Sequence, residues 1–302
     1  MTGARIDHQQ LEGAVAAADL RVLLMVLVHA SGDLGWLEPP FCPRRDIHLV
    51  ADPAAGLAPE VQQRIRAAAV QALSTGAPPA IHDPGDALMQ RMMSVCLGES
   101  VPPEYARLTR EEMALVPRRL GWPANVARPA GRDEHVLIVG AGVSGIALGA
   151  SLIELGVPFT IVEKAGDVGG AWFVNRYPGC GVDTPNHAYS FSFGPRFLWP
   201  RYFSRREEVL AYLRQVVEAL GLRRHIRLST QLMGATWDEE AQQWVARLRG
   251  PEGDSELRSR VLVSAIGQLS DPQLPRIEGA GTFAGESFHS ANWPEGLKVE
   301  GR

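Results

Sequence analysis

Short apolar runs bounded by turn residues mark the middle of this 302-residue chain. Residues 136–139 and 159–162 are largely apolar runs of the length that forms buried strands. Between them, apolar positions over 146–155 repeat at helical spacing, and Gly156 and Pro158 follow where a helix should end. The order strand, helix, strand predicts a parallel α/β unit.

The pattern downstream of this unit predicts an amphipathic helix over 207–220, which Gly221 ends. Three short strands should follow, around residues 226–228, 234–237 and 244–248. We expect them to form a β-meander that is inserted in the α/β domain. Trp237 and Trp244 fit cross-strand packing between two of these strands.

The first part of the chain, residues 1 to about 130, carries helical patterns instead. Apolar residues repeat at helical spacing at Val61, Ile65, Ala68, Ala69 and Ala72. Asp83 precedes Pro84, which predicts an N-cap and a proline at the first helical position of a helix that stops at Gly98. Leu20 to Ala30 is the most apolar stretch, but it is too short to span a membrane and predicts a packed helix.

Proline-rich residues 123–129 predict a linker between these two parts of the chain. We therefore expect a mostly α-helical N-terminal domain over 1–130, an α/β domain over 131–270 and a linker over 271–302. The length and the 45% hydrophobic content are sufficient for two cores.

Composition excludes several classes of partner. The net charge is −4 with interspersed signs and no basic stripe, which argues against nucleic-acid binding. Cys42, Cys96 and Cys180 are widely separated, so we expect three reduced thiols in a cytoplasmic protein with no membrane partner. His29 and Asp33 could be imagined as metal ligands, but they lack a third ligand, and we expect a structural role and no metal site.

The strand at 136–139 runs directly into Gly140-Ala141-Gly142-Val143-Ser144-Gly145, which fits the pattern G-x-G-x-x-G. The first glycine makes the tight turn, the second admits a pyrophosphate, and the third lets helix and strand pack closely, while the helix N-terminus offers free amides. Glu163 ends the second strand and can accept hydrogen bonds from ribose hydroxyls. Its charge would repel a 2′-phosphate, so this Rossmann-type site suits FAD or NAD better than NADP.

A second stretch, Gly279 to Ala284, also fits this glycine pattern. It follows Pro275 and a charged stretch instead of an apolar strand, and no helical pattern comes after it. We interpret it as part of the linker.

The run from Gly169 to Asp183 is typical of a loop that lies against a large planar ligand. Paired glycines let backbone amides approach closely, Trp172 supplies an aromatic face, and the Pro178-Gly179 pair turns the chain back. Asp183 then places a negative charge near the reacting end of that planar ligand.

This run matches the pattern [AG]-G-x-W-x4-[FY]-P-[GM]-x3-D at every specified position. Residues 283–293 fit F-x-G-x3-H-x3-W, and Ser264-Ala265-Ile266-Gly267 follows an apolar run as an A-T-G segment does in this superfamily. With these three motifs the chain resembles the Baeyer-Villiger monooxygenases, a branch of the class B flavin-dependent monooxygenases. The related N- and S-oxidising enzymes usually lack the final tryptophan.

The resemblance implies an FAD-binding domain over 131–270. The residues that it assigns to the cofactor are Gly140, Gly142, Ser144, Gly145, Glu163, Gly170, Ala171, Trp172, Asp183, Tyr189, Leu232 and Gly267. The backbone near Leu232 is an expected neighbour of the adenine. Asp183 matches the catalytic carboxylate that orients an arginine beside the flavin, and in the family that arginine belongs to a later NADPH-binding domain.

The motif F-x-G-x3-H-x3-W adds four residues of interest, Phe283, Gly285, His289 and Trp293. One interpretation is a linker that aromatic residues pin between two domains. The other is that His289 couples NADP binding to loop movement in the active site. Both interpretations need the same residues, and the sequence leaves both open.

The implied activity is the NADPH- and FAD-dependent oxidation of ketones by dioxygen to esters, through a flavin peroxide. The segment from Leu23 to Leu34 further resembles the start of the N-terminal extension in the 4-hydroxyacetophenone monooxygenase subgroup, which implies aryl ketone substrates and a role of the extension in dimerisation or stability. The chain reads as the N-terminal part of a longer enzyme, with most of the NADPH site outside it and little turnover on its own. The alternatives are an N- or S-oxidising flavin monooxygenase and a non-catalytic flavin-binding or dimerisation module.

Overall fold

The computed structural model describes residues 7–48, 51–116, 135–194, 197–297 and 299. The chain divides into two compact units, Met1–Arg118 and Arg119–Arg302. The expected domain boundary at 130 and the proline-rich linker over 123–129 both fall outside the described residues. The two units are therefore described separately.

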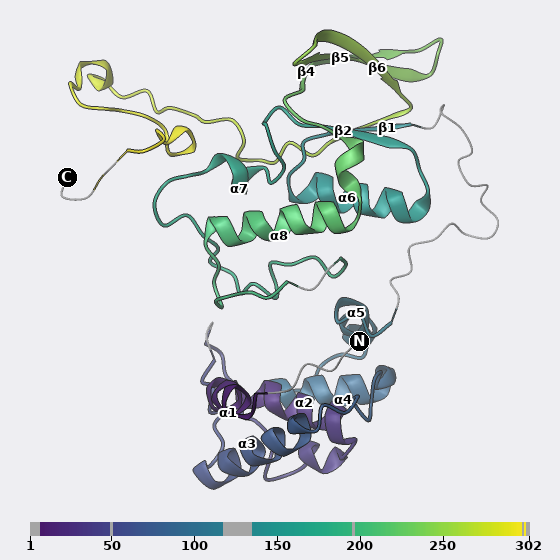
Figure 1. Cartoon of the computed structure of the whole chain (residues 1–302), viewed down its shortest axis with the longest axis vertical. Coiled ribbons are helices and arrows are strands. Elements are labelled where there is room, and N and C mark those ends of the chain that lie inside the picture. Colours follow the sequence, from purple (N-terminus) through teal and green to yellow (C-terminus); the bar gives the residue numbers. More distant parts are fainter. Residues whose placement is uncertain (1–6, 49–50, 117–134, 195–196, 298, 300–302) are drawn as a thin grey trace. The chain divides into compact units, whose positions relative to one another are not determined.

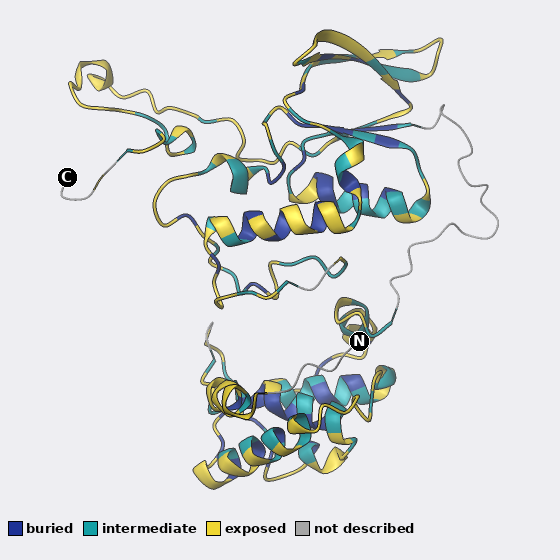
Figure 2. Cartoon of the chain, in the orientation of Figure 1, coloured by how far each residue is buried: buried dark blue, intermediate teal, exposed yellow. Residues whose placement is uncertain are grey.

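The first unit is helical, as the hydrophobic spacing predicts. Its α-helices are α1 (His8–Ala17), α2 (Leu20–Ser31), α3 (Pro59–Ser74), α4 (Gly85–Leu97) and α5 (Glu104–Glu112), with a 3-10 turn η1 (Leu34–Leu37) after α2. The apolar stretch from Leu20 forms α2, whose start is capped by the Asp19 side chain and whose end is a left-handed Gly32. Leu24 of α2 and Ile65 of α3 are fully buried in one cluster, so the packed-helix prediction is confirmed (Figure 2).

Helix α4 begins differently from the prediction. Pro84 occupies the N-cap position and the helix starts at Gly85, whose N–H donates to the Asp83 carboxylate at 3.1 Å. Asp83 was expected to be the N-cap itself, but its carboxylate also receives Arg110 of α5. The predicted end at Gly98 is correct, because that glycine adopts the left-handed conformation.

The His29 and Asp33 side chains have structural roles in this unit. His29 Nδ1 lies 2.9 Å from the Ile81 carbonyl oxygen, and the Asp33 carboxylate accepts from Gly35 N–H at 2.8 Å at the start of η1. Within the described residues, no group of three or more potential ligands is placed to hold a metal ion. Among all described residues of both units, no helix has both the length and the apolar character that are needed to cross a bilayer.

The second unit is a three-layer α/β structure. Its parallel sheet has the order β3-β2-β1-β7, formed by β1 (Val136–Val139), β2 (Phe159–Val162), β3 (Ile226–Arg227) and β7 (Val261–Ser264). Helices α6 (Val143–Leu155) and α8 (Arg206–Ala219) cover one face, and the antiparallel sheet of β4 (Gln231–Asp238), β5 (Gln243–Gly250) and β6 (Gly253–Ser259) covers the other (Figure 1). The described part of this unit also contains the short helical turns α7 (Ala171–Val174), η3 (Leu222–His225), η4 (Ala280–Thr282) and η5 (Ser290–Asn292).

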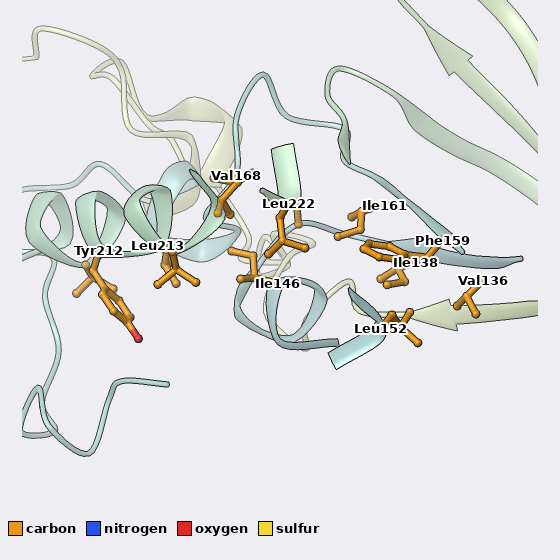
Figure 3. Packing of buried hydrophobic residues seen from close by; sticks show 14 residues of the cluster. Val136, Ile138, Ile146, Leu152, Phe159, Ile161, Val168, Tyr212, Leu213 and Leu222 are labelled. Atoms are coloured by element: carbon orange, nitrogen blue, oxygen red, sulfur yellow. The ribbon is translucent and has the colours of Figure 1, made fainter. Parts of the chain in front are cut away.

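The alternation of side chains along β1 explains this layering. Ile138 belongs to the large cluster that contains Ile146 of α6 and Leu213 of α8 (Figure 3). Its neighbour Leu137 faces the other way and packs with Leu248 of the antiparallel sheet. A strand buried on both faces is a continuous apolar run, as residues 136–139 are.

The antiparallel sheet corrects one sequence prediction. The run at 226–228 was expected in the β-meander, but Ile226 and Arg227 pair with β2 as the edge strand of the parallel sheet. The third strand of the meander is β6, whose sequence is too polar to show alternation and was missed. Trp237 and Trp244 stand opposite each other on β4 and β5 with ring centroids 5.5 Å apart, which confirms cross-strand packing.

Candidate functional site

The glycine-rich turn connects β1 to α6 and has the tight geometry that its sequence predicts. Gly140 has a φ of 106°, a conformation that residues with a side chain rarely adopt, and a Cβ there would stand 2.6 Å from the Ala265 carbonyl oxygen. A Cβ on Gly145 would lie 1.9 Å from the Gly140 carbonyl oxygen. The third glycine is therefore required for close approach of helix and strand, as expected.

The run that begins at Gly169 lies directly on this turn. Gly169 N–H donates to the Ala141 carbonyl oxygen at 3.0 Å. A Cβ on Gly170 would be 3.0 Å from the Gly142 Cα, so the two backbones touch where neither residue has a side chain. Two motifs that are separate in the sequence form one continuous backbone surface.

The start of α6 opens this surface toward solvent. Gly142 is the N-cap, and Val143 and Ser144 in the first turn are exposed. The first amides of a helix have no acceptor inside the helix and favour an anion. Amides at the helix start beside side-chain-free glycine fit the pyrophosphate of a dinucleotide.

Glu163 stands at the end of β2 and is 7% exposed. One carboxylate oxygen accepts from Ala141 N–H at 2.8 Å and the other accepts from Ala165 N–H at 2.8 Å. Each oxygen retains a further lone pair that can accept a hydroxyl hydrogen. The backbone of Ala141 thus holds Glu163 through its N–H group and Gly169 through its carbonyl group, a connection that the sequence did not reveal.

Trp172 and Tyr189 form a pair within the expected cofactor residues. The Trp172 indole N–H donates to the Tyr189 hydroxyl oxygen at 3.0 Å, and the two rings meet edge to face with centroids 5.6 Å apart. Trp172 lies in α7 directly after Gly170 and Ala171. The turn therefore carries an oriented indole ring next to the glycine-rich backbone surface.

Asp183 is exposed, and its carboxylate accepts a hydrogen bond from the Thr184 hydroxyl at 3.4 Å. It lies between the Tyr177–Cys180 turn and Tyr189 in the chain. The resemblance implies that the cation facing Asp183 is an arginine, which in the family belongs to a later domain. The proposed catalytic role of Asp183 stays a prediction.

Gly267 and Leu232 belong to different layers, since Gly267 follows β7 of the parallel sheet and Leu232 lies on β4 of the antiparallel sheet. Gly267 follows β7, and Ala265 N–H of the same segment donates to the Val139 carbonyl oxygen at 2.9 Å. Leu232 is half-buried on β4 and packs against the buried cluster between the two sheets, which includes Leu137 and Val162. The expected contact between the Leu232 backbone and an adenine stays a prediction.

Of the four motif residues Phe283, Gly285, His289 and Trp293, only Trp293 lines a cleft with the run from Gly169 to Asp183. Trp293 lines a cleft of about 440 Å³ together with the turn from Arg176 to Cys180. Phe283 is 67% exposed, and its ring lies 2.6 Å from the position that a Cβ on Gly285 would take. His289 accepts from Ala291 N–H at 3.0 Å as the N-cap of η5.

The segment before the paired glycines is held by charged side chains. The Asp167 carboxylate receives Arg214 of α8 at 2.8 Å and Arg223 of η3 at 3.0 Å. Partial burial raises the pKa of Asp167, but hydrogen bonds from Val168 N–H and from both arginines outweigh that effect and hold the pKa below its ordinary value. This ion-pair cluster, absent from the sequence predictions, fixes the approach to Gly169.

Comparisons with known proteins agree with this geometry. A sequence model of the NAD(P)-binding Rossmann-like domain matches residues 138–213. An uncharacterized monooxygenase of Sinorhizobium fredii is 35% identical over 98% of this chain and 44% of its own length. A Baeyer-Villiger monooxygenase of Streptomyces coelicolor is 42% identical over 56% of this chain and 32% of its own length.

Two further matches cover the second unit mainly. An FAD-binding monooxygenase of Dothistroma septosporum is 37% identical over 57% of this chain and 29% of its own length. The crystal structure of an ε-caprolactone-bound cyclohexanone monooxygenase superposes with a TM-score of 0.51 at 35% identity, over 56% of this chain and 34% of that one. The chain thus spans less than half the length of the relatives that it matches.

Proposed function

We propose that this chain, a homologue of the Baeyer-Villiger monooxygenases in class B of the flavin-dependent monooxygenases, binds FAD across its glycine turn and serves the oxidation of ketones to esters by dioxygen and NADPH. One observation carries the proposal: Gly170 lies against Gly142, and Gly169 is hydrogen-bonded to Ala141. The loop expected to face a planar ring is thereby joined to the turn expected to hold a pyrophosphate.

The residues of this chain would divide the work of binding. The first amides of α6 would bind the pyrophosphate, and the Glu163 carboxylate would accept from ribose hydroxyls with its remaining lone pairs. Trp172, oriented by Tyr189, would lie beside the flavin ring. When bound, FAD supplies the redox and oxygen-transfer chemistry, while the protein supplies position, charge and exclusion of water.

The proposed role of Asp183 is electrostatic. An exposed carboxylate beside the flavin-facing loop can orient a cation and tune its field. We propose that this cation is an arginine in the region of the longer relatives that lies beyond the matched part. Aryl ketones such as hydroxyacetophenones are the proposed substrates, on the basis of the N-terminal resemblance alone, and a homodimer through that extension is the proposed assembly.

FAD uptake by the 302-residue chain is the first test. We expect a yellow protein with one FAD per chain, measured by visible absorbance after removal of free cofactor. A chain that is folded by circular dichroism and takes up no FAD would contradict the proposal. Gly142→Val is a suitable negative control, because its side chain would fill the space between the glycine turn and Gly170.

The reaction is tested on a protein that extends to the full length of the relatives. We expect ester formation from acetophenones with matching NADPH consumption. Sulfoxides or N-oxides as the only products would favour the N- and S-oxidising branch instead, although Trp293 supports the Baeyer-Villiger branch.

A non-catalytic flavin-binding module is the second candidate for the chain as given. It is favoured because the described residues contain a single strand-glycine-helix unit, and that unit suits FAD. NADPH oxidation by the FAD-loaded 302-residue chain separates the two candidates. We expect little or none.

A further inference from the structure

Asn186 is a buried polar residue between Asp183 and Tyr189, in the segment that directly follows the run proposed to face the flavin ring. Its side chain is 1% exposed, and that of Ser204, its main partner, is 2% exposed. Neither residue belongs to the sequence motifs. A buried amide is costly unless its donors and acceptor are all paired, so its contacts define what it does.

The contacts of Asn186 are complete and reach across the chain. Its Nδ2 donates to the Arg201 carbonyl oxygen at 2.5 Å and to the Ser204 hydroxyl oxygen at 2.8 Å. Its Oδ1 accepts from Ser204 N–H at 3.0 Å. One side chain thus bonds three groups of a segment that follows it by more than a dozen residues.

Backbone hydrogen bonds extend this attachment. Asn186 N–H donates to the Tyr202 carbonyl oxygen at 3.0 Å, and Val182 N–H donates to the Ser204 carbonyl oxygen at 2.9 Å. Arg206 N–H donates to the Cys180 carbonyl oxygen at 2.9 Å where α8 begins. Residues 180–186 therefore lie along the chain that enters α8, a helix anchored in the core.

The Asn186 backbone also connects to the aromatic pair. Its carbonyl oxygen accepts from Tyr189 N–H at 3.0 Å and from the Ser190 hydroxyl at 2.5 Å. The Tyr189 hydroxyl in turn receives the Trp172 indole N–H. The path from the core helix to the indole ring thus passes through Asn186.

We propose that Asn186 is a positioning residue for flavin binding: its buried amide fixes the loop from Asp183 to Tyr189 on the entrance to α8. In this way it sets the place of the Asp183 carboxylate and the direction of the Tyr189–Trp172 pair. The inference rests on the proposed function, because the loop matters through the FAD beside it.

Two substitutions distinguish the effect of the Asn186 amide hydrogen bonds from the effect of the side-chain volume. Asn186→Leu keeps the approximate volume and leaves the Ser204 N–H and the Arg201 carbonyl without partners. Asn186→Asp keeps an acceptor for Ser204 N–H but turns an oxygen toward the Arg201 carbonyl oxygen. His187→Ala is the matched control, since the adjacent side chain is exposed.

The first measurement is hydrogen exchange of FAD-free protein. In the Asn186→Leu chain we expect roughly tenfold faster exchange in the peptides that cover 181–190 and 202–206, and unchanged exchange in β1 and β2. We expect His187→Ala to match wild type. Equal exchange in wild type and Asn186→Leu overturns the inference.

The second measurement is an FAD titration at a temperature where every variant is folded. We expect a dissociation constant roughly tenfold higher or more for both Asn186 variants, and a changed flavin absorption band because the indole ring is reoriented. A residue that contributes only to global stability would lower the melting temperature, speed exchange in β1 and β2 as well as in the loop, and leave the FAD titration unchanged. That result would also overturn the inference.

The outcome for wild type separates the two proposals. If the wild-type chain takes up FAD and the variants bind it equally well, the positioning role is wrong and the proposed function stands. If the folded wild-type chain takes up no FAD, the proposed function fails, and with it the claim that Asn186 positions a flavin loop.

Discussion

The carboxylate of Glu163 and the backbone of Ala141 are joined by a 2.8 Å hydrogen bond that crosses from the end of β2 to the glycine turn after β1. The acid expected to meet a ribose therefore already supports the turn expected to meet a pyrophosphate. Because both carboxylate oxygens accept backbone N–H groups, Glu163 shapes the site in addition to its proposed role in binding.

Glu163→Gln should destabilise the FAD-free chain. An amide offers one acceptor to two N–H donors, so one N–H group would face another donor in a buried place. We expect a loss of roughly 1–3 kcal/mol in the free energy of unfolding of the second unit, measured by chemical denaturation. Glu240→Gln, on an exposed turn, is the control. An unchanged unfolding free energy would mean that Glu163 acts on the ligand alone.

Gly145→Ala should be far more damaging than its small size suggests. The new Cβ would meet the Gly140 carbonyl oxygen at 1.9 Å, and backbone must move to admit it. We expect a loss of about 3 kcal/mol or more, together with loss of FAD binding, by denaturation and by absorbance. Gly166→Ala, whose Cβ would have its nearest neighbour at 4.0 Å, should be nearly neutral. Similar effects of the two substitutions would contradict the close-packing role.

Tyr189→Phe removes only the acceptor of the Trp172 indole N–H. The freed N–H can reach water, so the unfolding free energy should change by less than about 1 kcal/mol. The indole ring loses its fixed direction, and we expect weaker FAD binding and a shifted Trp172 emission by fluorescence. Tyr202→Phe, on a side chain that is 60% exposed, is the control. A Tyr189→Phe chain that binds FAD like wild type would show that the pair is not needed.

Asp167→Asn should make stability less dependent on pH. The folded-state pKa of Asp167 lies below its ordinary value, so the carboxylate stabilises the fold above the unfolded pKa and this contribution is lost as pH falls. We expect the variant to be less stable than wild type by about 1 kcal/mol at pH 7, with the difference narrowing below about pH 4. Thermal unfolding at several pH values measures it. A constant difference across that range would contradict an ionic role.

Sequence reasoning located the dinucleotide unit because its constraints are local. Gly140 and Gly145 are required by a turn and a close approach within a few residues, and an apolar strand precedes them. The strand β6 escaped detection because its exposed position permits polar residues throughout. Residues 226–228 were assigned to the wrong sheet, since a short edge strand has no pattern that distinguishes its partner.

Asn186 could not be found from the sequence for a different reason. Its partners Arg201 and Ser204 are brought to it only when the loop folds back along the entrance to α8. A polar residue in a polar stretch gives no sign that it is buried. Ion pairs such as Asp167 with Arg223 are hidden in the same way, because only the folded chain brings the charges together.

The link between Glu163 and Gly169 passes through the backbone N–H and C=O groups of residue 141 and not through its side chain. Replacing Ala141 by another small amino acid would leave both hydrogen bonds in place. An alanine scan would not test them, because the residue is already alanine. Proline, which removes the N–H group, would break the link to the acid. The hydrogen bonds that join Glu163 to Gly169 can therefore be retained when the amino acid at position 141 changes.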